Sequence, residues 1–126
     1  MSFSSVMIVG LGGFLGSIAR FLAVRSIDGR LNAVFPYGTL SVNLIGSFIL
    51  GLVYAYLAKK GAAGDQWKIF LGAGFCGGFT TFSAFAWENL TLLQGRLVSV
   101  SLIYIAVSLV GGLLAVTFGV WCSRFL

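Results

Sequence analysis

The stretch GAGFCGGFTTFSAFAWEN, residues 72–89, lies inside an apolar segment long enough to cross a membrane, yet it is rich in glycine and polar side chains. It contains four glycines, two threonines, a serine and a carboxylate. Polar or irregular backbone at membrane depth is tolerated only where protein buries it or it lines a watery cavity, because hydrocarbon offers its N–H and C=O groups no partners. The stretch is therefore the first candidate for a functional site.

The composition around this stretch is that of a membrane protein. Of the 126 residues, 59% are hydrophobic and 9% are charged, against roughly 25% charged in soluble domains. A membrane helix needs about 20 apolar residues, and four stretches qualify, at about residues 3–24, 37–58, 69–94 and 97–121. We therefore expect an all-α membrane protein, with one four-helix transmembrane domain over residues 1–126.

The sequence also argues against an enzyme. It has no histidine, which excludes Ser-His-Asp and Cys-His catalysis and HExxH metal sites. Cys76 and Cys122 fall in different spans, where buried cysteines usually act as small hydrophobic side chains. We expect no enzymatic activity.

The net charge of +5 is better explained by membrane orientation than by nucleic-acid binding, because the basic residues sit in loops and at span ends. They divide evenly between the two membrane faces, with Lys59, Lys60, Lys68 and Arg124 on one face and Arg20, Arg25, Arg30 and Arg96 on the other. Lys and Arg in short loops set orientation, so an even division allows insertion either way up. Four helices are few to enclose a pathway, and the sequence therefore predicts an antiparallel, dual-topology homodimer.

The third span is too long for one straight helix. Its glycines precede Thr80 and Thr81 near the middle of the span, and we expect a break around residues 77–81. The carbonyls freed there would lie near the bilayer centre, where a cation or side-chain donors could satisfy them. The alternative is a glycine-rich packing seam with a mild kink.

Polar residues of all four spans converge in depth. If the spans alternate in direction, Arg20, Asn43, Glu88 and Tyr104 fall one to two turns below the same face. Charged groups within a membrane usually have a partner, and we pair Glu88 with Arg20 in a vestibule. The alternatives are an Arg20 that extends to the headgroups, an Asn43 that only joins helices, and a purely structural ion pair. Ser108, one turn after Tyr104, extends the polar face.

Phe82 and Phe85 share a face just after the predicted break. Aromatic rings have a positive edge, so these rings could contact a small anion where no basic residue is present. The hydroxyls of Thr81 and Ser83 adjoin the pair and belong to the same candidate anion pathway. The alternative is that the rings only pack.

At these residues the chain closely resembles the Fluc fluoride channels, also called CrcB. The resemblance covers essentially the full length and rests on three ordered motifs: GGFLGSIARF in span one, PYGTLSVNLIGSFILG in span two and GFCGGFTTFSAF in span three. Tyr104 and Ser108 in span four match as well.

The resemblance implies a passive, fluoride-selective channel in the bacterial inner membrane that lets cytoplasmic fluoride leave. It also implies a dual-topology homodimer with two fluoride pathways and a structural sodium ion at its centre. By position, the backbone carbonyls of Gly77 and Thr80 match the sodium ligands. The partners expected are therefore a second copy, fluoride and the lipid bilayer, and no nucleic acid.

The resemblance also assigns roles within the pathway. Asn43 matches the pore asparagine, Phe82 and Phe85 the aromatic pair, and Tyr104 and Ser108 a polar track. The chain departs from some relatives at Gly112, where they have a hydroxyl. The far end of the track would then rest on water, backbone or Thr117.

Two other functions are alternatives for a chain of this kind. A dual-topology small multidrug antiporter has the same size, but its proton exchange requires a carboxylate in span one, and residues 3–24 contain none. A non-transporting assembly subunit would have the glycine seams without the polar cluster.

Overall fold

A computed structural model describes residues 1–126 and consists of helices without strands. Four helical stretches are long and apolar enough to cross a membrane: Phe3–Leu31, Tyr37–Ala58, Gly61–Gln94 and Val98–Phe125. Named elements within them are α1 (Phe3–Leu31), α2 (Tyr37–Ala58) and α6 (Val98–Cys122, followed by the 3₁₀ turn η3, Ser123–Phe125). The all-α class with four candidate spans, predicted from hydropathy, is confirmed.

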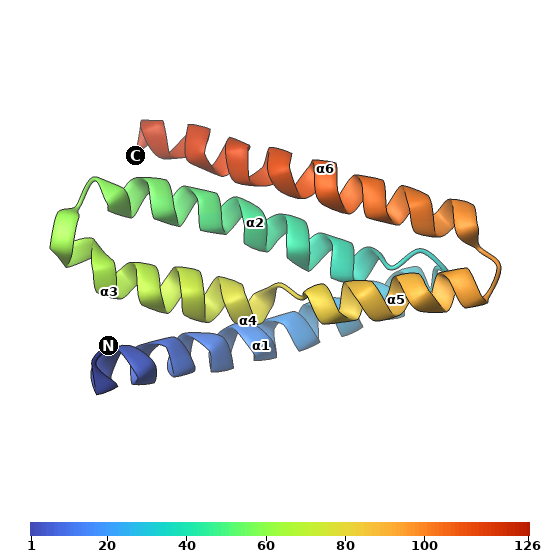
Figure 1. The fold of residues 1–126 in the computed structure, drawn as a ribbon, viewed down its shortest axis with the longest axis horizontal. Coiled ribbons are helices and arrows are strands. Elements are labelled where there is room, and N and C mark those ends of the chain that lie inside the picture. Colours follow the sequence, from blue (N-terminus) through green and yellow to red (C-terminus); the bar gives the residue numbers. More distant parts are fainter.

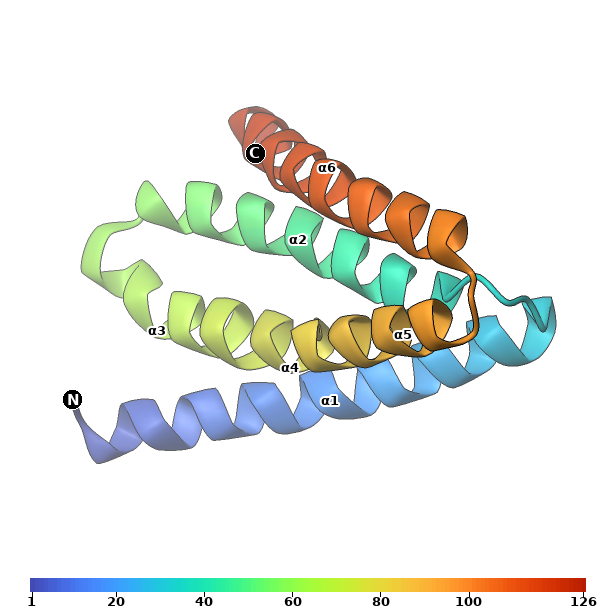
Figure 2. The ribbon, with the colours of Figure 1, turned by 45° about the vertical axis from the view of Figure 1, so that its right-hand side comes forward.

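The four spans run side by side with both termini at the same end (Figure 1). In both ribbon views α2 lies between α6 and the third span, and α1 lies along the third span away from α6 (Figures 1 and 2). The packing agrees, since α2 contacts α6 most extensively and α1 contacts the first half of the third span. The candidate site in the third span is therefore flanked by α1 and α2.

The third span is made of several helical segments: η1 (Gly61–Gly64), α3 (Asp65–Trp67), the π-helix η2 (Lys68–Cys76), α4 (Gly77–Phe79) and α5 (Phe82–Gln94). Between α4 and α5 the backbone is extended, with φ −92° and ψ 159° at Thr80 and φ −150° and ψ 120° at Thr81. Thr81 then caps α5, because its side-chain oxygen accepts a hydrogen bond from Ala84 N at 3.2 Å. The two threonines thus end one helical stretch and start the next.

Helix α1 is longer than predicted. We expected a span at 3–24 and a polar loop from residue 25, but the helix continues to Leu31. Polar side chains take the chain out of the apolar layer without breaking the helix, which ends only where Asn32 adopts a left-handed conformation with φ 44°. The extra turns bring Asp28 to the start of α2, where its carboxylate accepts from Gly38 N at 2.8 Å. The predicted bounds of α2, residues 37–58, agree with the structure.

Most large apolar side chains face outward. Only 20 of the 126 residues are buried, and exposed side chains such as Phe14, Leu102 and Leu113 cover the outer surfaces of α1 and α6. A soluble monomer rarely exposes so much contiguous apolar surface. Lipid or another apolar protein surface must cover it.

Glycines allow α1 and the third span to approach closely. Gly12 and Gly16, buried on α1, face the backbone of η2, and a Cβ on Gly16 would overlap the Phe75 carbonyl. Small residues at four-residue spacing permit this kind of contact between membrane helices. The close contact fixes the position of α1 beside the extended segment.

We expect Gly16→Ala to lower the stability of the protein by about 1–3 kcal/mol, because the added methyl group overlaps backbone that cannot move aside. Gly10→Ala is the matched control, since a Cβ there has nothing within 4 Å and alanine favours helix. Thermal unfolding in detergent measures both. Equal melting temperatures for the two variants would contradict this packing.

Candidate functional site

Asn43 of α2 holds the extended segment in place. Its Nδ2 donates to the Thr81 carbonyl at 3.1 Å, and its Oδ1 accepts from Thr81 N at 2.7 Å. In a continuous helix Thr81 N would donate to the carbonyl four residues earlier, that of Gly77. Asn43 therefore replaces a helical hydrogen bond and keeps one further N–H of its amide available.

Arg20 of α1 reaches the same region from the other side. Its Nε donates to the Gly78 carbonyl at 2.9 Å, whose helical partner would have been Phe82 N. The predicted ion pair between Arg20 and Glu88 is wrong, because the Lys68–Asp65 pair is the one salt bridge in the structure. The freed backbone carbonyl supplies the partner that the sequence analysis assigned to a carboxylate.

Glu88 is held by hydroxyls instead. Its two oxygens accept from Thr39 Oγ1 at 2.6 Å and from Tyr104 OH at 2.9 Å. Both donors are buried, with exposed fractions of 2% and 0%, and a carboxylate at this depth requires such partners. The sequence analysis placed Glu88 and Tyr104 at the same depth, and in the structure the two side chains are in contact. Thr39 was missed, although its position one turn before Asn43 places it on the same face of α2.

A pocket of about 240 Å³ lies beside the extended segment. It combines hydroxyl, amide and aromatic groups from three spans and is lined by Asn43, Thr80, Thr81, Phe82, Phe85, Ser108 and Leu109. The Ser108 hydroxyl is buried without a hydrogen-bond partner. A buried unpaired hydroxyl is costly and needs an explanation, and here it borders open space. The pocket therefore offers hydrogen-bond donors but no lysine or arginine.

The two phenylalanines of this pocket have different surroundings. Their ring centroids are 5.6 Å apart. Phe85 also packs edge-on against Tyr104, with ring centroids 5.1 Å apart, and so contacts the small buried core of Leu40, Leu92 and Tyr104. Phe82 is 77% exposed. Packing within one chain accounts for Phe85, whereas Phe82 remains mostly exposed although its ring lies beside that of Phe85.

Three other residues of the predicted pathway lie outside the pocket lining. Tyr104 is fully buried and donates to Glu88, and Ser83 Oγ lies 3.3 Å from Thr81 Oγ1. Thr117 donates to Leu113 of its own helix, so it does not replace the hydroxyl absent at Gly112. A Cβ at Gly112 would instead lie 4.0 Å from Ser47 Oγ, so α2 carries a hydroxyl near that position.

A second pocket, of about 330 Å³, lies between α2 and the first half of the third span. Gly77 and Thr80, the predicted cation ligands, both line it, together with Asn43 and Cys76. Backbone carbonyls are hard oxygen donors, which suit hard cations rather than thiophilic metals. No group of His, Cys, Asp and Glu side chains in the structure could hold a metal ion. The chemistry of the available donors therefore fits a cation held by backbone oxygens.

Comparison with known proteins now decides the family. The model of the family described as "CrcB-like protein, Camphor Resistance (CrcB)" matches residues 7–120. The chain belongs to the CrcB family. The resemblance drawn from the three sequence motifs is thereby confirmed.

Curated CrcB relatives resemble this chain over nearly their whole length. A protein of Leptospira interrogans is 43% identical over 125 residues, 98% of each chain. One of Flavobacterium psychrophilum is 40% identical over 120 residues, 95% of this chain and 97% of its own. One of Thermus thermophilus is 43% identical over 119 residues, 94% of this chain and 93% of its own. Each of these relatives carries the name fluoride-specific ion channel FluC.

Membership of the CrcB family and the four candidate spans indicate a multi-pass membrane protein. They do not favour the antiporter. The longer α1 does include one carboxylate, Asp28, but it lies in the last turns of the helix and accepts from Gly38 N. Asp28 therefore caps the start of α2 and is not an unpaired carboxylate within the membrane, as proton exchange would require.

Proposed function

We propose that this chain forms a passive, fluoride-selective channel that lets fluoride leave the cytoplasm across a bacterial inner membrane. The observation that carries the proposal is the pocket beside the extended segment, where the unpaired Ser108 hydroxyl and the Asn43 amide meet two aromatic rings. The name shared by relatives about 40% identical supports fluoride as the solute.

The chemistry of the pocket suits a small anion in transit. Hydroxyl and amide N–H groups replace part of the hydration shell that the anion loses, and ring edges add a weak positive potential. A channel must bind its ion strongly enough to admit it and weakly enough to release it. A pocket with donors but no fixed positive charge meets both requirements.

Efflux from liposomes tests the channel function. Purified protein in vesicles loaded with potassium fluoride should release fluoride after valinomycin is added, whereas matched vesicles loaded with potassium chloride should retain chloride. Protein-free vesicles provide the background rate. Equal rates of fluoride and chloride release would contradict selectivity, and fluoride release at the background rate would reject the proposal.

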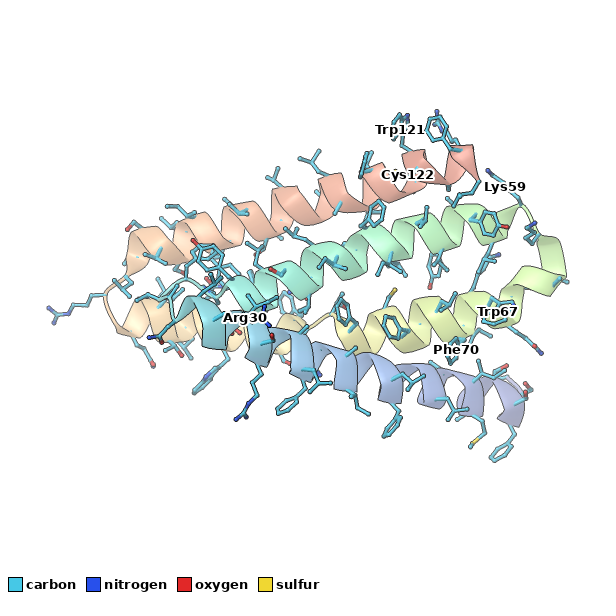
Figure 3. All side chains as sticks on the ribbon, turned by 180° about the vertical axis from the view of Figure 1, so that it is seen from behind. Arg30, Lys59, Trp67, Phe70, Trp121 and Cys122 are labelled. Atoms are coloured by element: carbon cyan, nitrogen blue, oxygen red, sulfur yellow. The ribbon has the colours of Figure 1, made fainter.

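We also propose that two copies assemble as an antiparallel homodimer. The basic side chains support this arrangement: Lys59 lies at the end of the molecule with both termini, the same end as Trp67 and Trp121, and Arg30 lies towards the other end (Figure 3). Neither end dominates, so both orientations are accessible. The exposed apolar faces and the open pockets next to the extended segment are the surfaces that a second copy would cover.

Dual topology predicts that a C-terminal tag will be found on both sides of the membrane. Labelling of a single added C-terminal cysteine with a membrane-impermeant reagent, before and after lysis, measures the two fractions in a background where Cys122 is serine. About half of the protein should react before lysis. Adding three lysines to the loop at residues 59–64 should shift that fraction strongly. A single orientation in the unmodified loop would reject the antiparallel dimer.

The last part of the proposal is a structural sodium ion at the Gly77 and Thr80 carbonyls. Thr81 N, the helical partner of the Gly77 carbonyl, donates to Asn43, and Thr80 lies outside any helix. Carbonyls without helical partners at membrane depth need another partner, and a bound cation provides it.

A further inference from the structure

Side chains decide which carbonyls of the third span are available for other partners. The Cys76 carbonyl accepts from Thr80 N and from Thr80 Oγ1, both at 2.9 Å. The Gly78 carbonyl accepts from Arg20 Nε at 2.9 Å. No side chain donates to the carbonyl of Gly77 or to that of Thr80. Of these four carbonyls, that of Cys76 is paired within the third span, that of Gly78 is paired with Arg20 of α1, and those of Gly77 and Thr80 accept from no side chain.

Arg20 can reach the third span because two helices approach at glycine. A Cβ on Gly78 would lie 2.5 Å from the Gly13 carbonyl and 3.0 Å from Ser17 N of α1. The contact leaves no room for rotation of α4 about its axis. The Gly78 carbonyl therefore points towards α1, and Gly77 and Thr80 line the pocket that faces α2.

We propose that Arg20 is a positioning residue for the cation site, an inference that rests on the sodium ion in the proposed function. By holding the Gly78 carbonyl towards α1, it fixes the rotation of the last helical turn and leaves the Gly77 and Thr80 carbonyls free for the cation. Its guanidinium also excludes a cation from the α1 side of the extended segment, because like charges repel strongly where water is scarce. Arg20 thereby selects both the side and the ligands of the site without touching the ion.

Two substitutions separate the hydrogen bond from the charge. Arg20→Gln removes the charge but keeps an N–H donor at the fourth side-chain atom, the position of arginine Nε. Arg20→Met matches the glutamine variant in length, and it removes both the charge and the N–H donor. Arg25→Met is the matched control for charge, because Arg25 lies on the same helix and its guanidinium is 6.0 Å from the Phe21 ring centroid rather than on the third span.

The measurement is the sodium concentration that gives half of the maximal rise in melting temperature of the purified full-length protein, with choline replacing sodium. This readout does not depend on fluoride flux. Arg20→Met should raise the midpoint by about tenfold or more, the scale of one charge-assisted hydrogen bond. Arg20→Gln should stay within about threefold of the wild type, and Arg25→Met should not change the midpoint.

Equal shifts for Arg20→Gln and Arg20→Met, or an equal shift for Arg25→Met, would overturn the inference, because they would assign the effect to charge alone. If Arg20→Met does not fold, the sodium midpoint of Arg20→Lys tests the inference instead. Its ammonium lies one atom beyond the Nε position, so a shift of about threefold supports the inference and a wild-type midpoint overturns it. A wild type that does not respond to sodium overturns both this inference and the sodium ion, while fluoride efflux still tests the channel separately.

Discussion

Replacing Asn43 with alanine is expected to lower fluoride efflux by roughly 10- to 100-fold in a protein that still folds. The amide makes both hydrogen bonds that hold Thr81 in its extended conformation. Leaving a buried backbone donor or acceptor unpaired costs about 1–3 kcal/mol. The segment would relax to recover those bonds, and the pocket formed by Thr80, Thr81 and Phe82 would lose its shape.

Asn89→Ala is the matched control for this experiment. Asn89 is buried, with an exposed fraction of 7%, whereas Asn43 is half-buried. The Asn89 amide likewise makes two hydrogen bonds, to the Phe85 carbonyl and from Ser101 Oγ. It does not line the pocket, so its loss should lower the melting temperature but leave efflux per folded protein within about threefold.

A second substitution at the same position distinguishes support of the backbone from contact with the anion. Asn43→Asp keeps the oxygen that accepts from Thr81 N, loses the donor and adds a negative charge beside the pathway. If the amide faces fluoride, this variant should conduct as poorly as Asn43→Ala. Wild-type efflux in Asn43→Ala would return the residue to a role in helix packing alone.

Phe82→Ile is expected to lower fluoride efflux by about tenfold without loss of stability. The substitution keeps most of the apolar bulk and removes the ring edge, whose interactions are worth about 0.5–1.5 kcal/mol beyond burial. Because Phe82 is 77% exposed within one chain, its replacement disturbs no intramolecular core. The rate should therefore fall while the melting temperature stays constant.

Phe85→Ile tests the contact between ring edges and the anion less directly than Phe82→Ile, because it is expected to change stability as well as efflux. Phe85 packs against Tyr104, so the same change should lower stability by up to about 1.5 kcal/mol as well as reduce efflux. Phe14→Ile is the matched control, since Phe14 is 64% exposed on α1 and does not line the pocket. Unchanged efflux in both Phe82→Ile and Phe85→Ile would end the proposal that ring edges contact the anion.

Hydropathy determined the all-α class and the number of spans. Each span is a long apolar run, and in a bilayer such a run has one stable solution, because only a helix pairs all its backbone groups internally. The bounds of α2 followed for the same reason, with Pro36 opening the helix where its missing N–H costs little. The end of α1 did not follow, because leaving the bilayer is not a signal to stop a helix.

The members of the site could also be proposed from the sequence. Polar residues are rare at membrane depth, so Asn43 stood out before any contact was known. Phe82 and Phe85 stood out because they share a face just after the predicted break. Ser108 followed from its position one turn after Tyr104, and resemblance to a family added the carbonyls of Gly77 and Thr80. The structure places all six around two pockets that share Asn43 and Thr80.

Only the tertiary structure decided the hydrogen-bond partners of Arg20 and Glu88. Depth along the membrane places Arg20 and Glu88 at one level, but pairing depends on helix rotation, which sequence spacing does not define. Glycine contacts turn Arg20 towards the Gly78 carbonyl, and Glu88 instead accepts from Thr39 and Tyr104. A charged side chain within a membrane needs a hydrogen-bonding or ionic partner, and several kinds of group can serve. Helix packing determines which of these groups lies close enough to pair with it.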